Sequence, residues 1–92
     1  MTNKHLLIAI FTFFAFTLTA CSNKEEQALA LVKIGIEKYN AGNLEDALID
    51  FNESLELYEL SEAYYNRGLI YDDQEKRQKA LFDYGKAIEL DE

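Results

Sequence analysis

The chain repeats itself at an offset of 33 residues, and this repeat constrains its fold more than any other feature. The aligned pairs are Gly35 with Gly68, Ala47 with Ala80, Phe51 with Tyr84, Ser54 with Ala87, and Glu56-Leu57 with Glu89-Leu90. Small residues suit places where two backbones approach each other, and aromatic residues fill the wider gaps. A recurring unit of this length is one supersecondary element used twice, which buries its apolar face by stacking. The repeat therefore predicts two similar, stacked units.

Each unit is predicted to be a helical hairpin. The chain has no proline and only four glycines, so it lacks the usual punctuation of strands and tight turns. Apolar residues recur at spacings of three and four, which is typical of amphipathic helices. The predicted helices are Lys24 to Ala41, Leu44 to Tyr58, Glu62 to Asp73 and Arg77 to Leu90. The predicted fold class is all-α, with two tandem helix-turn-helix hairpins.

Three of the predicted helix starts carry residues that can cap a helix. Asn23, with Glu26 three residues later, has the pattern of a capping box. Asn43 precedes the second helix, and Ser61 precedes Glu62 at the start of the third. We expect their side-chain oxygens to accept hydrogen bonds from the first-turn N–H groups.

The repeated unit resembles the tetratricopeptide repeat, a helical hairpin of about 34 residues with small and aromatic residues at these offsets. The second copy matches the family at Tyr64, Gly68, Tyr71, Ala80, Tyr84, Ala87 and the run Ile88 to Asp91, and the first at Gly35, Gly42, Ala47, Phe51 and Leu57. The resemblance implies an α-solenoid, with one repeat at residues 28–60 and the other at 61–92. It also implies a protein that binds a peptide or protein partner.

The chain departs from the family pattern at several positions. Lys38 stands where the family has tyrosine, although Tyr39 is adjacent, and the final proline is missing from both copies. Glu75 replaces the turn glycine, so we expect the turn from residue 73 to residue 76 to be looser than the turn at Gly42.

Arrays of this kind normally need about three repeats and a polar cap. Two repeats should leave apolar side chains of the last helix, such as Leu81, Phe82 and Ile88, without a neighbour in the chain. We therefore expect these residues to meet a partner or a second copy, unless the chain is a shortened form of a longer array.

The first residues look like the leader of a bacterial lipoprotein. A cationic start at Lys4 precedes an apolar segment, residues 6–18, that is short for a membrane span of about 20 residues. The run Leu18-Thr19-Ala20-Cys21 resembles a lipobox and contains the only cysteine. The resemblance implies that residues 1–20 are removed and that Cys21 carries fatty acyl chains such as palmitate. Residues 21–27 would then form a short linker.

An unpaired cysteine in an exported chain needs an explanation, and acylation provides one. An uncleaved anchor and an ordinary signal peptide are the alternatives. Ser22 follows the cysteine where aspartate would retain similar lipoproteins in the inner membrane. We therefore expect the outer membrane, facing the periplasm, with the outer face of the cytoplasmic membrane as the alternative.

The formal net charge of −8 limits the classes of partner. A chain this acidic does not bind nucleic acid by neutralising phosphates, and anionic lipid headgroups repel it.

The resemblance implies a concave groove between the first helices of the two repeats. The candidate groove residues are Val32, Ile36, Tyr39 and Asn40 from the first copy, with Tyr65, Leu69, Asp72 and Asp73 from the second. An apolar floor with an acidic edge suits an amphipathic peptide or protein segment that carries basic residues. Relatives that clamp a terminal carboxylate use lysine and asparagine on this face, so that ligand is not expected here. The alternative is that these side chains pack against each other or against a neighbouring subunit.

Neither catalysis nor metal binding is expected. Asp46 and Asp50 share a helix face, but glycan cleavage needs two carboxyls about 5 to 9.5 Å apart with one in a pocket that raises its pKa. The run from Asp72 to Glu75 lacks the alternating ligands and central glycine of a calcium loop. We interpret these carboxylates as solvated charge and expect no cofactor besides the covalent lipid. The sequence thus predicts a membrane-tethered interaction module or scaffold at the bacterial envelope, or alternatively a self-assembling structural subunit.

Overall fold

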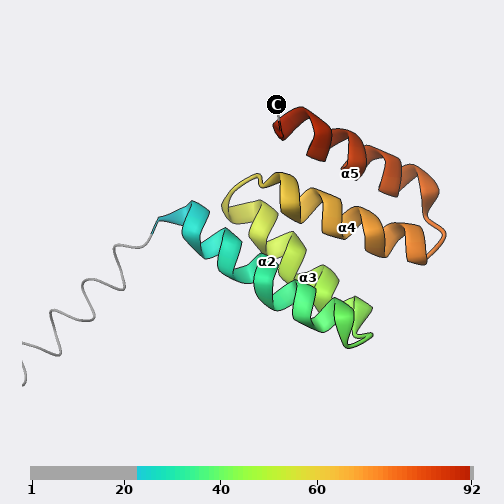
Figure 1. The fold of residues 1–92 in the computed structure, drawn as a ribbon, viewed down its shortest axis with the longest axis horizontal. Coiled ribbons are helices and arrows are strands. Elements are labelled where there is room, and N and C mark those ends of the chain that lie inside the picture. Colours follow the sequence, from blue (N-terminus) through green and yellow to red (C-terminus); the bar gives the residue numbers. More distant parts are fainter. Residues whose placement is uncertain (1–22, 92) are drawn as a thin grey trace, which may run out of the picture.

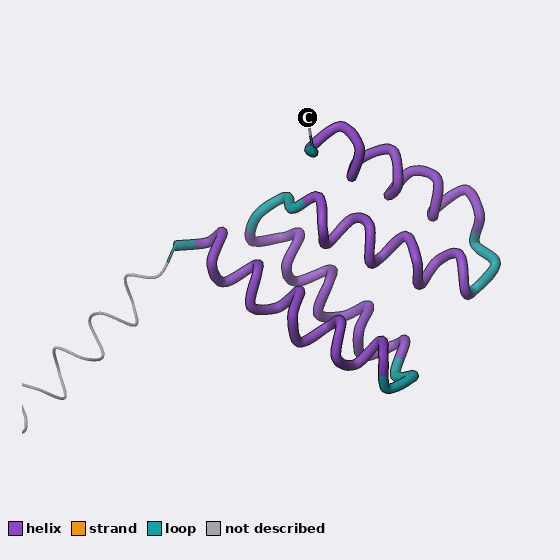
Figure 2. Tube along the Cα trace, viewed as in Figure 1, coloured by secondary structure: helices purple, strands orange, loops and turns teal. Residues whose placement is uncertain are grey.

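The computed structural model describes residues 23–91, which fold into four helices (Figure 1). The helices are α2 (Lys24–Asn40), α3 (Leu44–Leu57), α4 (Ser61–Asp73) and α5 (Arg77–Leu90). No residue in that range lies in a strand (Figure 2). The all-α prediction is confirmed, and every predicted helix boundary is correct to within one residue. The predicted signal peptide and the predicted lipidation at Cys21 lie outside the described residues, and none of these four helices could span a membrane.

The helices form two hairpins that stack side by side. Helix α2 packs against α3, and α4 packs against α5 (Figure 1). Between the hairpins, α4 lies mainly on α3 and touches α2 more lightly. This arrangement is the tandem hairpin stack that the sequence repeat predicts, and it leaves α5 at the open end of the stack.

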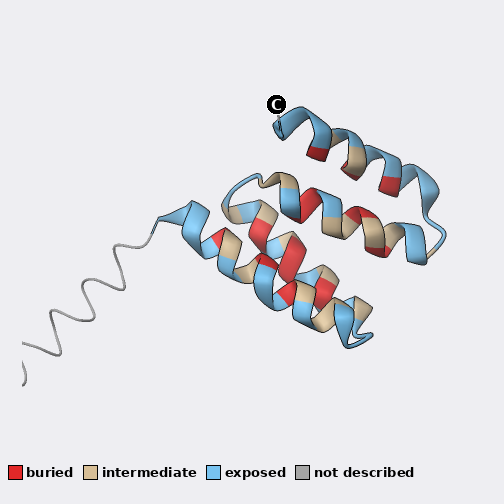
Figure 3. Ribbon diagram, in the orientation of Figure 1, coloured by how far each residue is buried: buried red, intermediate tan, exposed pale blue. Residues whose placement is uncertain are grey.

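The hydrophobic core is shared between the hairpins. Its buried members are Val32 of α2, Ala47 and Phe51 of α3, and Ala63 and Ile70 of α4. Buried positions accordingly lie on the facing sides of the helices (Figure 3). Because α4 supplies part of the cluster that covers Phe51, the first hairpin completes its core only when the second is present.

The repeated glycines lie where a helix approaches an aromatic ring. A Cβ atom added at Gly35 would lie 2.6 Å from a ring carbon of Phe51, and one at Gly68 would lie 2.7 Å from a ring carbon of Tyr84. Real Cβ atoms do not approach so closely, so any larger residue would push the ring away. The role predicted for these small residues is confirmed.

Only one of the three predicted caps forms. The Asn23 side chain accepts a hydrogen bond from the Glu26 N–H (2.8 Å) at the start of α2. Asn43 makes no such bond. The prediction for Ser61 is wrong, because α4 begins at Ser61 itself and Leu60 is its N-cap. The Ser61 hydroxyl instead donates to the carbonyl of Ala87 (3.0 Å), which ties α4 to α5.

The turns within the two hairpins are alike, so the prediction of a looser second turn is wrong. Both end their first helix with a Schellman pair of backbone hydrogen bonds. These bonds run from Asn43 to Lys38 and from Gly42 to Tyr39 in the first hairpin, and from Lys76 to Tyr71 and from Glu75 to Asp72 in the second. Glu75 adopts the left-handed conformation of a turn glycine, with φ of 61° against 87° at Gly42. The chain therefore keeps the turn and accepts the strain of a non-glycine residue.

We expect Glu75→Gly to raise the free energy of unfolding by about 0.5–1 kcal/mol. Relief of a left-handed side chain contributes about 1–2 kcal/mol, and the added flexibility of glycine in the unfolded chain offsets part of it. Urea unfolding followed by circular dichroism measures the change. Gly42→Ala is the matched control and should lower stability, since it introduces the same strain. A destabilised Glu75→Gly variant would contradict this account.

Candidate functional site

The structure divides the candidate groove into three separate environments. Val32 is 1% exposed and belongs to the shared core, so the prediction that it lines a groove is wrong. Ile36 is half-buried and packs against the same core. The reason is that α4 lies over this face of the first hairpin and closes it to solvent.

Tyr39 and Asp73 form a bridge between the two hairpins. The Tyr39 hydroxyl donates to Oδ2 of Asp73 (2.7 Å), joining the end of α2 to the end of α4. This hydrogen bond, together with burial, raises the pKa of Tyr39 to about 12. Asn40 and Asp72 lie near this bridge in the sequence and are exposed. Of the candidate groove residues, Tyr39 and Asp73 are thus in direct contact across the two repeats.

Tyr39→Phe should lower the free energy of unfolding at neutral pH by about 0.5–1.5 kcal/mol, because it removes one hydrogen bond to a charged group. Only the neutral phenol can donate to Asp73. The stabilisation by this hydrogen bond is therefore complete below about pH 10, the ordinary tyrosine pKa, and is lost as the pH rises through about 12. Urea unfolding measures the first effect. Ultraviolet titration should show a tyrosine near pH 12 that is missing from the variant, and the absence of this titration from the native protein would contradict the bridge.

The other apolar groove residues, Tyr65 and Leu69, line a hollow of about 580 Å³ between α4 and α5. The full lining is Ser61, Glu62, Tyr65, Asn66, Leu69, Tyr84, Ala87, Ile88 and Asp91. Tyr65 is 50% exposed, and its ring lies 5.9 Å from the ring of Tyr84 at a tilt of 44°. The two charged residues of this lining, Glu62 and Asp91, are both acidic. The hollow is therefore a largely apolar surface with two acidic residues at one end.

The last helix also exposes large apolar side chains, as predicted. Leu81, Phe82 and Ile88 are among the most exposed apolar residues of the described range. Leu81 and Ile88 align with Leu48 and Leu55 in the first repeat, which pack against the core. Of these three, Ile88 lines the hollow, whereas Phe82 lies beside Arg67 and Tyr71 on another face.

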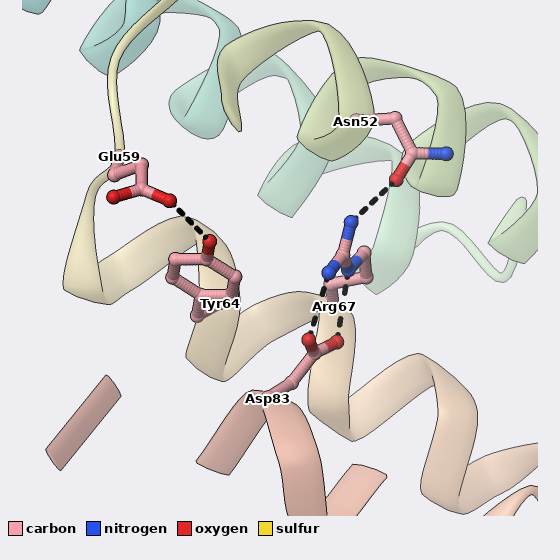
Figure 4. A network of polar contacts seen from close by, with 5 residues as sticks. All are labelled: Asn52, Glu59, Tyr64, Arg67 and Asp83. Carbon is pink, nitrogen blue, oxygen red and sulfur yellow. Dashed lines mark hydrogen bonds and ion pairs between the residues drawn. The ribbon is translucent and has the colours of Figure 1, made fainter. Parts of the chain in front are cut away.

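A charged network, which the sequence analysis missed, connects α3, α4 and α5 (Figure 4). Arg67 forms two parallel hydrogen bonds with Asp83, from Nε to Oδ2 (2.9 Å) and from Nη2 to Oδ1 (2.8 Å). Its third nitrogen donates to Oδ1 of Asn52 in the first hairpin (3.0 Å). Asp83 is 1% exposed, and its carboxylate raises the pKa of Arg67. The pair therefore holds the second hairpin together and fastens it to the first.

Aromatic rings enclose the arginine. Its guanidinium carbon lies 5.5 Å from the ring centre of Tyr64 and 5.7 Å from that of Tyr71. The Tyr64 hydroxyl donates to Glu59 (2.8 Å), which fixes the ring in place (Figure 4). This network is structural, since its charges are paired and aimed at each other.

The first repeat has an equivalent buried carboxylate. Asp50 aligns with Asp83, and it pairs with Lys38 at 2.8 Å. The interpretation of Asp50 as solvated charge is therefore wrong, because it is buried on the α3 face that packs against α2. Lys38, which stands where the family has tyrosine, supplies the cation of this pair. The signal was present in the sequence: each aspartate lies three residues after a repeated alanine, on the small-residue face of its helix.

A comparison with known protein families finds a match to the second hairpin. Residues 61–92 match the family model of the tetratricopeptide repeat. The second hairpin is therefore similar in sequence to a tetratricopeptide repeat. The first hairpin has the same turn, the same glycine contact and the same buried aspartate, so the described part of the chain is an α-solenoid of two such hairpins. No curated protein was found to match the chain.

Tetratricopeptide repeats generally act as protein–protein interaction modules and are typically non-catalytic. Within residues 23–91, no group of three or more histidine, cysteine or acidic residues could hold a metal ion. In the described part of the chain, the hollow between α4 and α5 offers an exposed apolar surface for binding.

Proposed function

We propose that this protein is a membrane-tethered interaction module that holds a peptide or protein partner at the bacterial envelope. The observation that supports binding is the exposed apolar hollow on a tetratricopeptide repeat. The support for tethering is the leader, whose run Leu18-Thr19-Ala20-Cys21 resembles a lipobox. In this proposal Cys21 is acylated, the helical domain of residues 23–91 stands in solvent, and it binds its partner reversibly.

The tether would be very short. Helix α2 begins at Lys24, so residues 24–27 of the expected linker are helical. The three peptide units from Cys21 to Lys24 reach at most about 10 Å when extended. A partner bound by this domain would therefore stay close to the membrane, at a high effective concentration for membrane-bound targets. The acidic surface would keep the domain off anionic headgroups.

The proposed location is the outer membrane, facing the periplasm, as expected for a serine after the lipidated cysteine. The outer face of the cytoplasmic membrane is the alternative for a host with one membrane.

Mass spectrometry of the protein from envelope fractions tests the tether. We expect a mature chain that begins at Cys21 and carries acyl chains, and a Cys21→Ser variant that leaves the membrane fraction. Residues 23–91 are unchanged in this variant, so its circular dichroism spectrum should match the native one. An unmodified Cys21 thiol in the envelope would overturn the tethering part of the proposal.

Crosslinking in cells tests the binding part. Tyr65→Ala combined with Leu69→Ala should lose crosslinked partners while keeping the helical spectrum, because Tyr65 is half-exposed and Leu69 only partly buried. Ile49→Ala is the matched control, since Ile49 is exposed on α3 away from the hollow. Partner capture that is unchanged in the double variant would contradict binding at this surface.

A further inference from the structure

The hollow corresponds to the face of the first hairpin that α4 covers. At the offset of 33 residues, Tyr65 aligns with Val32, Leu69 with Ile36, Tyr84 with Phe51, and Ile88 with Leu55. In the first hairpin these four positions form or adjoin the shared core under α4. The second hairpin therefore presents a surface of the kind that, one repeat earlier, binds a helix.

The exposures differ as expected for an uncovered helix-binding face. Val32 is 1% exposed and its counterpart Tyr65 is 50% exposed. Leu55 is half-buried, and its counterpart Ile88 is 70% exposed. Among the described helices, α5 packs against α4 alone and lies at the open end of the stack (Figure 1), so none of the other described helices packs on its outer side.

We propose that this face binds one amphipathic helix of a partner protein, seated in the way that α4 is seated on the first hairpin. The proposal rests on the proposed interaction function and specifies the chemistry of its partner. That partner carries a small residue and an aliphatic residue seven positions later on one face, with basic residues at its edges.

Helix α4 supplies the template for the apolar face. Ala63 and Ile70 are both fully buried and are two helical turns apart, so they lie on the same side of α4. The small residue permits close approach, and the aliphatic one fills the space between two helices. Because α4 begins shortly after α3 ends, a helix in the equivalent place has its N-terminus beside Asp91 at the end of α5. The positive end of its dipole would face that carboxylate.

The charge of the face indicates a basic partner. Glu62 and Asp91 lie at one end of the hollow, and Asp72 follows Leu69 by one turn of α4. The chain as a whole carries a net charge of −8. Lysine or arginine beside the bound apolar stripe would gain attraction from these carboxylates and speed association.

The same register argues against a second copy as the occupant. In a head-to-tail stack, α2 of the next copy would take the place of α4. Glu37 aligns with Ile70, so a carboxylate would replace a fully buried aliphatic side chain. Burying an unpaired carboxylate is strongly unfavourable, and two acidic chains also repel each other.

Fluorescence anisotropy with designed peptides tests the proposal. The probe is a labelled helical peptide with alanine and isoleucine seven residues apart and lysine at the positions that flank this apolar stripe. It is titrated with the full-length protein in neutral detergent, with detergent alone as the blank. One control peptide replaces the isoleucine by aspartate, and another replaces every lysine by glutamate. The protein variants are Ile88→Ser on the proposed face and Ile49→Ser as its match on an exposed site elsewhere.

The lysine peptide should bind. Ile88→Ser should lower the affinity for this peptide by at least about tenfold, as truncation of an interface anchor does, and Ile49→Ser should lower it by less than about twofold. Both control peptides should bind at least about tenfold more weakly, with added salt narrowing the lysine–glutamate difference. Absence of binding, or equal weakening by both serine variants, would overturn the proposal. A dimer that excludes the peptide and that Ile88→Ser dissociates would identify a second copy as the occupant and overturn it too. The lipidation state of Cys21 does not enter this measurement, so failure of the tether and failure of the helix site are distinguishable.

Discussion

Asp83→Ala is expected to lower the free energy of unfolding by about 3–5 kcal/mol, since it breaks a buried ion pair by removing one partner. Asp83 is almost completely buried, and the Arg67 side chain that faces it is only 18% exposed. Without the carboxylate, the guanidinium loses two hydrogen bonds in a place where water replaces them poorly. Small domains have a total stability of only about 5–15 kcal/mol, so this variant should be largely unfolded in mild urea.

A double variant shows whether the loss comes from the stranded charge. Arg67→Met with Asp83→Leu removes both charges and should recover much of the stability, because apolar residues of similar volume often replace a buried pair without cost. Asp46→Ala, at an exposed carboxylate on α3, should change stability by less than about 0.5 kcal/mol. If Asp83→Ala proved as mild as Asp46→Ala in urea unfolding, the ion pair would not stabilise the fold.

Phe51→Ala should also cost about 3–5 kcal/mol, which is the usual price of a large cavity in a core. Phe51 is fully buried, lies against Gly35 of α2 and contributes to the cluster that contains Ala63 and Ile70 of α4. Gly35 offers no side chain that could move into the space. Both hairpins should loosen together, as measured by thermal unfolding and by exposure of dye-binding apolar surface.

Phe82→Ala is the matched control for the loss of a phenylalanine. Phe82 lies on α5 and is among the most exposed apolar residues, so its removal should shift stability by less than about 0.5 kcal/mol. Equal losses from the two phenylalanine variants would mean that the shared core contributes less than its burial indicates.

The helices and their stacking could be predicted because their causes are local and repeated. Apolar spacing of three and four fixes a helix within each segment, and the recurrence of Gly35 as Gly68 shows where two elements meet. These signals need no knowledge of what lies across the molecule. The helix boundaries were therefore accurate to within a residue, and the hairpin order was correct.

The candidate site depended on contacts between the repeats, and it was predicted only in part. Val32 and Tyr65 occupy the same repeat position, yet one is buried and the other half-exposed, because α4 covers only the first. The Arg67 network was missed because the two cations do not align. Arg67 aligns with Ile34, one helical turn before Lys38, which is its functional counterpart in the first repeat. The prediction of a looser turn at Glu75 was wrong for another reason. The hydrogen bonds of that turn outweigh the strain of one left-handed residue.

Other predictions lie outside the residues that the structure describes. The signal peptide, the acylation of Cys21 and the location in the envelope rest on the leader sequence alone. They stay predictions, and mass spectrometry of the native protein is their direct test.

The placement of Arg67 has a consequence for how the molecule comes apart. Its guanidinium binds the carboxylate of Asp83 in its own hairpin and the side-chain amide of Asn52 in the other hairpin. The hydrophobic core around Phe51 also contains residues of both hairpins. Neither hairpin can unfold without exposing the core and breaking the hydrogen bonds that it shares with the other. Heating should therefore give a single sigmoidal transition with equal calorimetric and van't Hoff enthalpies. A protease that nicks the loop between α3 and α4 should consequently leave two fragments that stay associated until that step is reached.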